Sequence, residues 1–531
     1  MDAPIPQLTL PQARSRWDGR ATWCAVALAG LLAALQYFTF LPHESSLWTD
    51  PVHDRNTHYL LGVQIAYDVR HGHIGGLFRD LNGARVWPPL HGLILGGILT
   101  VTGSETKFAV LPSVLAWAGL LVAAFAAARR ISPTAGNLAG LIALLLAAAS
   151  PSHRAFAVDA MLESLGTCLS LWAVERYLNL RGSSTKSAVR SFAVVLLGLF
   201  LTKYNYWALV CFGIAATEAV TRPGLWLKPR TLLRTPEARI LIRWFIVPVI
   251  VWFCLPGRVG AFIWFGFIQA GEHPDADFGS RLGKCADWLL HDFHTNLFMF
   301  IVAAASAIYG AFQLRRKTVV ILLFLSISAV LTIRHPNCKS RFLMSWLPAL
   351  WVLSGVGVAS LLGRRLWTQL TAAVIFAALC LPHAIELGCA QESGMRPSAP
   401  TLRRLSEITL PLMEADRRTA VFSTVPMKSF LQWSLLQHSG HIRDRELDAK
   451  GWLPLERDDL AGFVAWLDRA RCDRVIVLRV ERNSPFYAEV PGWHGDRLLA
   501  DWREMNRDFE PVTEENVAEW AFTVTVFRRK P

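Results

Sequence analysis

The chain has 531 residues, of which 53% are hydrophobic and 18% are charged, and its formal net charge is +13. Soluble proteins carry about 25% charged residues, and here the apolar residues come in blocks long enough to cross about 30 Å of hydrocarbon. This composition excludes an ordinary soluble protein. The positive charge does not require nucleic acid as a partner, because the basic residues cluster in short loops between apolar blocks, where membrane topology places them.

Residues 1–21 are polar and carry three arginines directly before an apolar stretch at 22–41. This stretch is long enough to cross a membrane and has no convincing cleavage site, so it predicts an uncleaved anchor. Arginines before a span hold the preceding segment in the cytoplasm. We therefore expect a cytoplasmic N-terminus and an outer loop at 43–87, within which 57–72 has the spacing of an interfacial helix.

Further apolar blocks recur along the chain to residue 386. The block at 90–101 follows two prolines and is too short for a span, so we expect it to be re-entrant or interfacial. The other blocks predict, with the first stretch, about eleven transmembrane helices in a domain at 22–388, with a second outer loop at 257–294. They lie at 108–128, 136–150, 155–178, 189–202, 205–220, 244–256, 296–314, 318–333, 342–362 and 366–386.

Residues 389–531 are mixed in composition, charged and aromatic, and predict a soluble α/β domain. An odd number of spans places this domain on the outer side of the membrane, with the first loop. It begins with a linker at 391–400. Strands are predicted at 419–423, 474–480 and 520–528, and an amphipathic helix at 456–471.

Two aspartates, Asp50 and Asp54, lie in the first outer loop. Partial burial at a lipid–water boundary raises the pKa of a carboxyl group toward neutrality, so such a group can act as a general base. A solvated loop acid is the alternative. Ionisable groups at membrane faces are functional more often than elsewhere, so both aspartates are candidates for catalysis.

Asp159 and Glu163 lie at the outer start of a predicted span and are spaced to share one helix face. Like charges at that spacing repel unless a cation or substrate lies between them. A bridging metal ion is one interpretation, and contacts with other helices are the other. His273, in the second outer loop beside two aspartates, could supply a metal ligand or cover the site.

Four basic residues lie at positions predicted to be near the outer face of the membrane. Lys203, in 201-LTKY-204, needs an anion inside a membrane domain, and a phosphate at the outer leaflet would serve; snorkelling to the surface is the alternative. Arg334, Lys339 and Arg341 share one outer turn, against the usual positive-inside bias. A polyprenyl-phosphate headgroup is a natural counter-charge for them, and a phospholipid headgroup is the alternative.

Nine cysteines are scattered along the chain without a CxxC or Cys/His spacing, which argues against a zinc site. Four of them are predicted to lie outside the membrane: Cys285, Cys338, Cys389 and Cys472. The sequence leaves their pairing open, and a Cys338–Cys389 disulfide is one option.

Taken together, these segments resemble the GT-C superfamily of polytopic glycosyltransferases, in particular the family 39-like enzymes of the protein O-mannosyltransferase and lipid A aminoarabinose transferase type. The resemblance covers residues 20 to about 365, and the order and spacing of the motifs carry it. The matching elements are Asp54 with Tyr59, 87-WPPLHGL-93, Asp159 with Glu163, 201-LTKY-204 and 341-RFLMSWLP-348. Val86-Trp87 stands where the family often has Glu-Lys, which leaves the metal and the acceptor open.

The resemblance implies an inverting transfer of a sugar from a polyprenyl-phosphate donor to an acceptor hydroxyl, at the outer face of the inner (plasma) membrane. The acceptor would be a lipid, a glycan or a protein. Asp54, with Asp50 as the fallback, would be the base. Lys203 and Arg341, with Lys339 and Arg334, would bind the donor phosphate. Asp159, Glu163, His273 and Tyr59 would lie near the substrate or a divalent metal ion.

A lipid-linked-sugar transporter or flippase is the rival hypothesis. A transporter needs a polar path between the two membrane faces. The charges predicted within the membrane region instead gather near the outer face, which favours the transferase.

Overall fold

The computed structural model describes two compact units of the chain. Unit 1 comprises Met1–Phe40, Gly75–Ile94 and Val110–Gly388, and unit 2 comprises Leu41–Ile74, Leu95–Ala109 and Cys389–Pro531. The residues described are 16–43, 53–83, 87–103, 106–132, 135–182, 185–223, 235–263, 278–335, 338–363, 365–387, 419–423, 449–452, 465, 467–469, 473–480, 504, 508–517 and 522–530. The predicted domain boundary at residues 388 and 389 stays a prediction.

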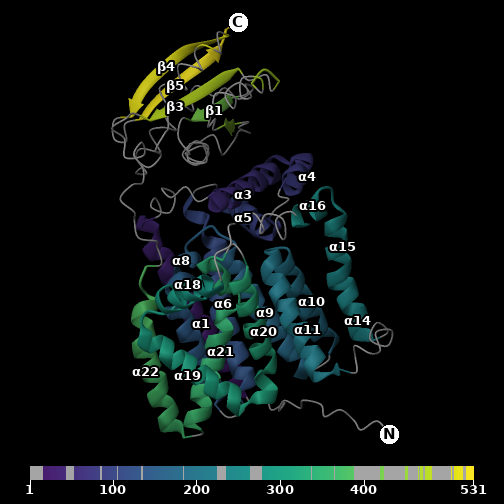
Figure 1. Cartoon of the computed structure of the whole chain (residues 1–531), viewed down its shortest axis with the longest axis vertical. Helices are drawn as coiled ribbons and strands as arrows, with labels where there is room; N and C mark the ends of the chain where they lie inside the picture. The colour runs from purple at the N-terminus through teal and green to yellow at the C-terminus, as the bar shows by residue number, and fades with distance from the viewer. Residues whose placement is uncertain are drawn as a thin grey trace. The chain divides into compact units, whose positions relative to one another are not determined.

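Unit 1 is built from helices (Figure 1). Their bounds are α1 Arg16–Phe40, α4 Ile74–Gly83, α5 Leu90–Thr102, α6 Leu111–Ile131, α7 Gly136–Ala149, α8 Pro151–Ala157, α9 Glu163–Gly182, α10 Lys186–Phe200, α11 Tyr204–Thr221, α14 Pro236–Leu241, η3 Ile242–Ile246, α15 Val247–Cys254, α16 Arg258–Ile263, α18 Phe278–His291, α19 Leu297–Gln313, α20 Arg315–Arg334, η5 Ser340–Ser345, α21 Leu347–Leu362 and α22 Leu366–Ala384. Ile74 and the second half of α5 belong to unit 2.

Three of the described helices are long and apolar enough to cross a membrane, namely Gly19–His43, Leu111–Ile131 and Leu366–Ala384. The pair α7 and α8 would form a fourth span, although it is bent by 71°. Shorter apolar helices include α5, α19 and α21. The predicted total of about eleven spans stays a prediction.

The bend between α7 and α8 has a local cause. Pro151 begins α8, and the residue before a proline avoids helical geometry. Ser150 is accordingly extended, with φ −67° and ψ 119°, so α7 ends at Ala149. The chain bends again at residues 158–162, between α8 and α9. The single span predicted at 155–178 is therefore wrong in its first part, because this second bend precedes Glu163.

The core of unit 1 forms where α6, α7, α19 and α21 pack closely. These helices bury small residues that allow their backbones to approach. A Cβ atom on Gly310 would lie 2.7 Å from the carbonyl oxygen of Leu353. A Cβ atom on Gly357 would overlap the carbonyl oxygen of Ser306, and one on Gly355 would overlap that of Ala139. Glycine is thus required on α21 for contact with both α7 and α19.

Gly357→Ala should destabilise unit 1, because the added methyl group forces α19 and α21 apart. Overpacking of this kind costs about 1–3 kcal/mol. Thermal unfolding of the purified protein in detergent should show a lower midpoint. Gly30→Ala is the matched control, since a Cβ atom there meets no atom within 4 Å. Equal midpoints for the two variants would contradict the tight crossing.

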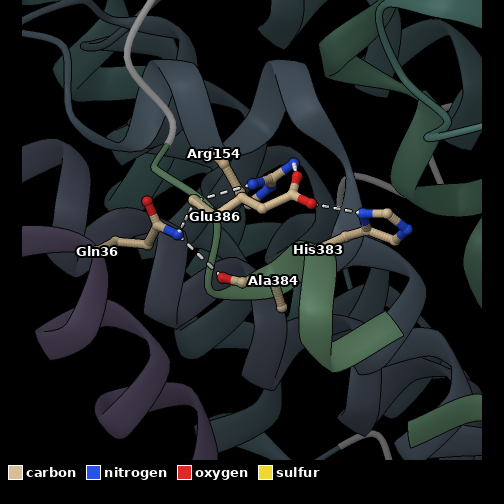
Figure 2. Close-up of polar contacts among 5 residues, drawn as sticks. All are labelled: Gln36, Arg154, His383, Ala384 and Glu386. Atoms are coloured by element: carbon tan, nitrogen blue, oxygen red, sulfur yellow. Dashed lines mark hydrogen bonds and ion pairs between the residues drawn. The ribbon is translucent and has the colours of Figure 1, made fainter. Parts of the chain in front are cut away.

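The C-terminal end of α22 is held by side chains from α1 and α8 (Figure 2). The last carbonyl groups of a helix have no partner within it. Gln36 Nε2 donates to the carbonyl oxygens of Ala384 at 2.9 Å and of Glu386 at 2.6 Å. Arg154 donates to the Glu386 carbonyl oxygen at 2.8 Å and to its carboxylate at 3.2 Å. His383 Nδ1 lies 2.9 Å from the other carboxylate oxygen. These contacts fix the end of unit 1 that precedes the predicted linker.

Unit 2 contains η1 Leu41–His43, α3 His53–His71, the second half of α5 and η2 Thr106–Phe108. The helix expected at 57–72 is confirmed up to His71 as part of α3, and its interfacial position stays a prediction. It packs closely on α5, since a Cβ atom on Gly62 would lie 2.6 Å from Leu95 and one on Gly96 would lie 2.5 Å from Ile65. Arg70 at the end of α3 donates hydrogen bonds to the carbonyl oxygens of Leu99 and Thr100.

The C-terminal part of unit 2 holds a five-stranded sheet with the order β2-β1-β3-β5-β4. The strands are β1 Thr419–Ser423, β2 Ala449–Trp452, β3 Arg474–Val480, β4 Phe509–Val517 and β5 Phe522–Arg529. β1 is parallel to β2 and β3, whereas β5 is antiparallel to β3 and β4. The strands predicted at 419–423 and 474–480 are confirmed, and the strand predicted at 520–528 is confirmed from Phe522 onward. Most of the helix expected at 456–471 lies outside the described residues, and the α/β class of the whole domain stays a prediction.

Candidate functional site

A buried ionic cluster in unit 1 joins Glu163, Lys203 and Arg341. Lys203 Nζ donates a hydrogen bond to Glu163 Oε1 at 2.7 Å, and Arg341 Nε lies 3.6 Å from the same oxygen. The side chains of Glu163 and Lys203 are 1% and 5% exposed, and that of Arg341 is 20% exposed. Charged groups are rarely buried in this way unless they are paired, and inside a membrane domain such groups usually mark a substrate or ion site.

Three separate bends of the backbone bring these groups together. Glu163 is the first residue of α9, immediately after the bend at 158–162. Lys203 is extended at the corner between α10 and α11, which lie side by side (Figure 1). Arg341 lies in the short helix η5 before α21. The corner at Lys203 is fixed in turn by the start of α5, because Leu90 N donates to Leu201 O at 2.9 Å.

Tyr206, which was not predicted from the sequence, contacts Lys203 and Arg341 and packs against α9, the helix that begins with Glu163. Lys203 Nζ lies 4.6 Å from the centroid of its ring, and its hydroxyl donates to the carbonyl oxygen of Arg341 at 2.7 Å. Gly166, three residues after Glu163, lets the ring approach α9, since a Cβ atom there would lie 2.8 Å from it. The sequence signal that could have identified Tyr206 is its position in 201-LTKYNYW-207, because a residue three positions after Lys203 on a helix lies next to it.

Asp159 does not share a helix face with Glu163, so that prediction is wrong. It lies in the bend between α8 and α9 and is 9% exposed. The bend places the two carboxylates on different backbone segments. Lys339 and Arg334 flank η5 but are exposed, so Arg341 is the cation of this turn that the structure pairs with Glu163. Their binding to a phosphate stays a prediction.

Asp54 and Tyr59 lie on α3, in unit 2. Asp54 is in the first turn of the helix and is partly buried, and Tyr59 is fully buried. Their approach to the Glu163 cluster stays a prediction. Asp50 and His273 fall outside the described residues.

Within the part of the chain that the structure describes, no group of three or more His, Cys, Asp or Glu residues could hold a metal ion. The cluster itself offers a single carboxylate beside two cations, which is a poor environment for a divalent cation. The residues of this cluster therefore do not fit the divalent metal ion that the resemblance allows.

No family model matches this sequence, and no curated protein matches it. Solved structures match it in fold. ArnT from Cupriavidus metallidurans bound to undecaprenyl phosphate superposes with a TM-score of 0.60 at 15% identity, covering 94% of this chain and 97% of that one. Oligosaccharyltransferase from Archaeoglobus fulgidus, in complex with Zn and sulfate, gives 0.53 at 10% identity, covering 94% and 72%.

Arabinofuranosyltransferase AftD from Mycobacteria gives a TM-score of 0.50 at 14% identity and covers 99% of this chain and 41% of that one. All three neighbours are glycosyltransferases of the GT-C superfamily. This chain therefore has the GT-C fold, and the fold expected from the resemblance is confirmed.

Proposed function

We propose that the protein is a membrane glycosyltransferase that moves a sugar from a polyprenyl-phosphate donor to an acceptor hydroxyl. The observation that carries this proposal is the buried cluster of Lys203, Arg341 and Glu163 within a GT-C fold. A buried pair of cations suits a phosphate that must be held in a water-poor site. The match in fold to ArnT bound to undecaprenyl phosphate supports this donor class.

Glu163 orients Lys203 and Arg341 toward the donor. An ammonium group has three N–H donors, so Lys203 can keep its bond to Glu163 and still donate to a phosphate oxygen. The guanidinium of Arg341 offers a planar set of donors that matches phosphate geometry. Lys339 and Arg334, exposed beside Arg341, would attract the anionic headgroup to this turn over a longer range.

The chemical step is a displacement at the anomeric carbon. Asp54, or Asp50 in its place, takes the proton of the acceptor hydroxyl, and the oxygen attacks the anomeric carbon opposite the phosphate. The bond between that carbon and the phosphate oxygen breaks, and polyprenyl phosphate leaves with the electron pair, so the configuration inverts. Lys203 and Arg341 stabilise the negative charge on the leaving phosphate, while Asp159, Tyr59 and His273 would contact the sugar or the acceptor.

The reaction would take place at the outer face of the inner membrane, with the C-terminal domain on the same side. The predicted topology supports this orientation, because basic loops fall between the apolar blocks on the opposite side. The acceptor would be an envelope lipid, a glycan or a protein. Mass spectrometry of glycolipids and glycoproteins from a deletion strain should identify it as the molecule that loses a sugar.

The direct test uses the purified protein in detergent with a labelled polyprenyl-phosphate sugar and the acceptor found in that way. We expect release of polyprenyl phosphate and a glycosylated product whose anomeric configuration, measured by NMR, is opposite to that of the donor. Donor movement across the membrane of reconstituted vesicles without any glycosyl product would instead identify a transporter.

A further inference from the structure

Cys285 and Cys338 lie beside each other in unit 1, although 53 positions separate them in the sequence. Cys285 is in the third turn of α18, and Cys338 lies in the turn between α20 and η5. Their Sγ atoms are 3.6 Å apart. A disulfide requires about 2.05 Å, so small side-chain rotations would bring the two sulfur atoms to bonding distance.

The two segments that carry these cysteines are held together independently of the thiols. Helix α18, which carries Cys285, packs against α20, which ends shortly before Cys338. The carbonyl oxygen of Asp292, just after α18, also accepts hydrogen bonds from Ser152 of α8, at 2.9 Å from its amide nitrogen and 2.8 Å from its hydroxyl. The approach of the two thiols is therefore part of a packed corner rather than a chance contact of loose segments.

We infer that Cys285 and Cys338 form a native disulfide that ties α18 to the turn carrying Arg341. The sequence had left the partner of Cys338 open and offered Cys389, which lies outside the described residues. Both Cys285 and Cys338 lie in segments predicted to face the outer side of the membrane, where disulfides persist.

The local charges favour the bond-forming reaction. The hydrogen bond from the Cys285 thiol lowers the pKa of Cys338 to about 7, against the opposing effect of burial, and the positive charges of Arg281 and Lys284 add to the lowering. Cys285 is the poorer acid, because its bond to Cys338 and its burial raise its pKa. Cys338 is thus the thiolate that reacts first.

The oxidant is a disulfide of a small molecule or of a thiol oxidase, and the reaction is thiol–disulfide exchange. The Cys338 thiolate attacks one sulfur of that disulfide, forms a mixed disulfide and releases one thiolate. Cys285 then loses its proton and attacks the Cys338 sulfur, which releases the second thiol. In total, two protein thiols are oxidised to one disulfide, and the external disulfide is reduced to two thiols.

The placement of this bond gives it a consequence for the candidate site. Arg341 follows Cys338 by three residues, in the short segment that connects α20 to α21. A covalent link to α18 limits the positions that this turn can take, and it therefore limits the movement of the Arg341 guanidinium beside Glu163.

Peptide mapping of the native protein tests the inference. Cells expressing the full chain are lysed in N-ethylmaleimide, and the membrane protein is digested without reduction. We expect a linked pair of peptides containing Cys285 and Cys338, which separates on reduction, and no maleimide on either residue. Alkylation of both residues, or a linked pair that joins Cys338 to Cys389, would overturn the proposal.

A thermal measurement gives a second readout on the intact protein. Dithiothreitol should lower the unfolding midpoint of the wild type but leave that of Cys338→Ser unchanged. Cys254→Ser is the matched control, because Cys254 is an exposed free cysteine on α15, and this variant should keep the full response to dithiothreitol. An unfolding midpoint of the wild type that does not change with dithiothreitol would contradict the disulfide. If Cys338→Ser fails to fold, the linked peptides decide whether the disulfide exists.

Discussion

Lys203→Met should lower the free energy of unfolding of the protein by about 3–5 kcal/mol, the cost of breaking a buried ion pair by removing one partner. Methionine fills much of the space of the lysine stem, so lost packing contributes little. The loss arises at Glu163, which is 1% exposed and loses a hydrogen bond of 2.7 Å. Arg341 Nε, at 3.6 Å, compensates for only part of this charge.

The double variant Lys203→Met with Glu163→Gln should recover most of that stability, because no uncompensated carboxylate then remains. Replacing both members of a buried pair is often close to neutral. Thermal unfolding midpoints of the wild type, both single variants and the double variant give the coupling between the two residues. Strictly additive effects would mean that the pair does not act as a unit.

A measurement of sugar-transfer activity distinguishes the structural role of Lys203 in the ion pair from its proposed role in binding the donor phosphate. The double variant, although its stability is restored, still lacks the cation that we assign to the donor phosphate. Its rate of sugar transfer should therefore stay at least about 100-fold below that of the wild type, which is the loss seen when one stabilising donor is removed. Its affinity for polyprenyl phosphate should fall as well. A stable double variant with nearly full activity would remove Lys203 from the site and leave the ion pair a structural feature.

Lys203 and Arg341 could be recognised from the sequence as cations that need an anion, and the structure places both of them beside Glu163; their binding of a donor phosphate stays a prediction. The sequence analysis did not predict that Glu163 would be that anion in this structure. The i, i+4 rule placed Glu163 beside Asp159, and that rule holds only along a continuous helix. The bend at 158–162 depends on how α8 packs, which local sequence does not encode.

The proximity of Cys285 and Cys338 could not be predicted for the same reason. Contacts across 53 positions depend on the arrangement of α18, α20 and η5, and hydrophobic periodicity carries no information on that arrangement. The strands at 419–423 and 474–480 were predictable, because short runs of apolar and β-branched residues have a local signature. β2, with the sequence AKGW, has no such signature, and its existence depends on pairing with β1.

Asp54→Asn should reduce the turnover number for sugar transfer by about 100- to 10,000-fold, the contribution that a general base typically makes. Asparagine has almost the same shape as aspartate but cannot accept the proton of the acceptor hydroxyl. The residue lies in the first turn of α3, where loss of a negative charge near the helix N-terminus costs about 0.3–1 kcal/mol, so the unfolding midpoint should change little. The affinity for polyprenyl phosphate should also be preserved, because Asp54 is not assigned to the phosphate.

This combination of results distinguishes the base from the phosphate-binding residues. Lys203→Met weakens donor binding, whereas Asp54→Asn leaves the bound donor unreacted. Asp287→Asn is the matched control: Asp287 lies on α18 with a side chain that is 68% exposed, and its replacement should preserve turnover. A turnover number near that of the wild type in Asp54→Asn would transfer the role to Asp50, and only if Asp50→Asn were also active would a base in this loop be ruled out.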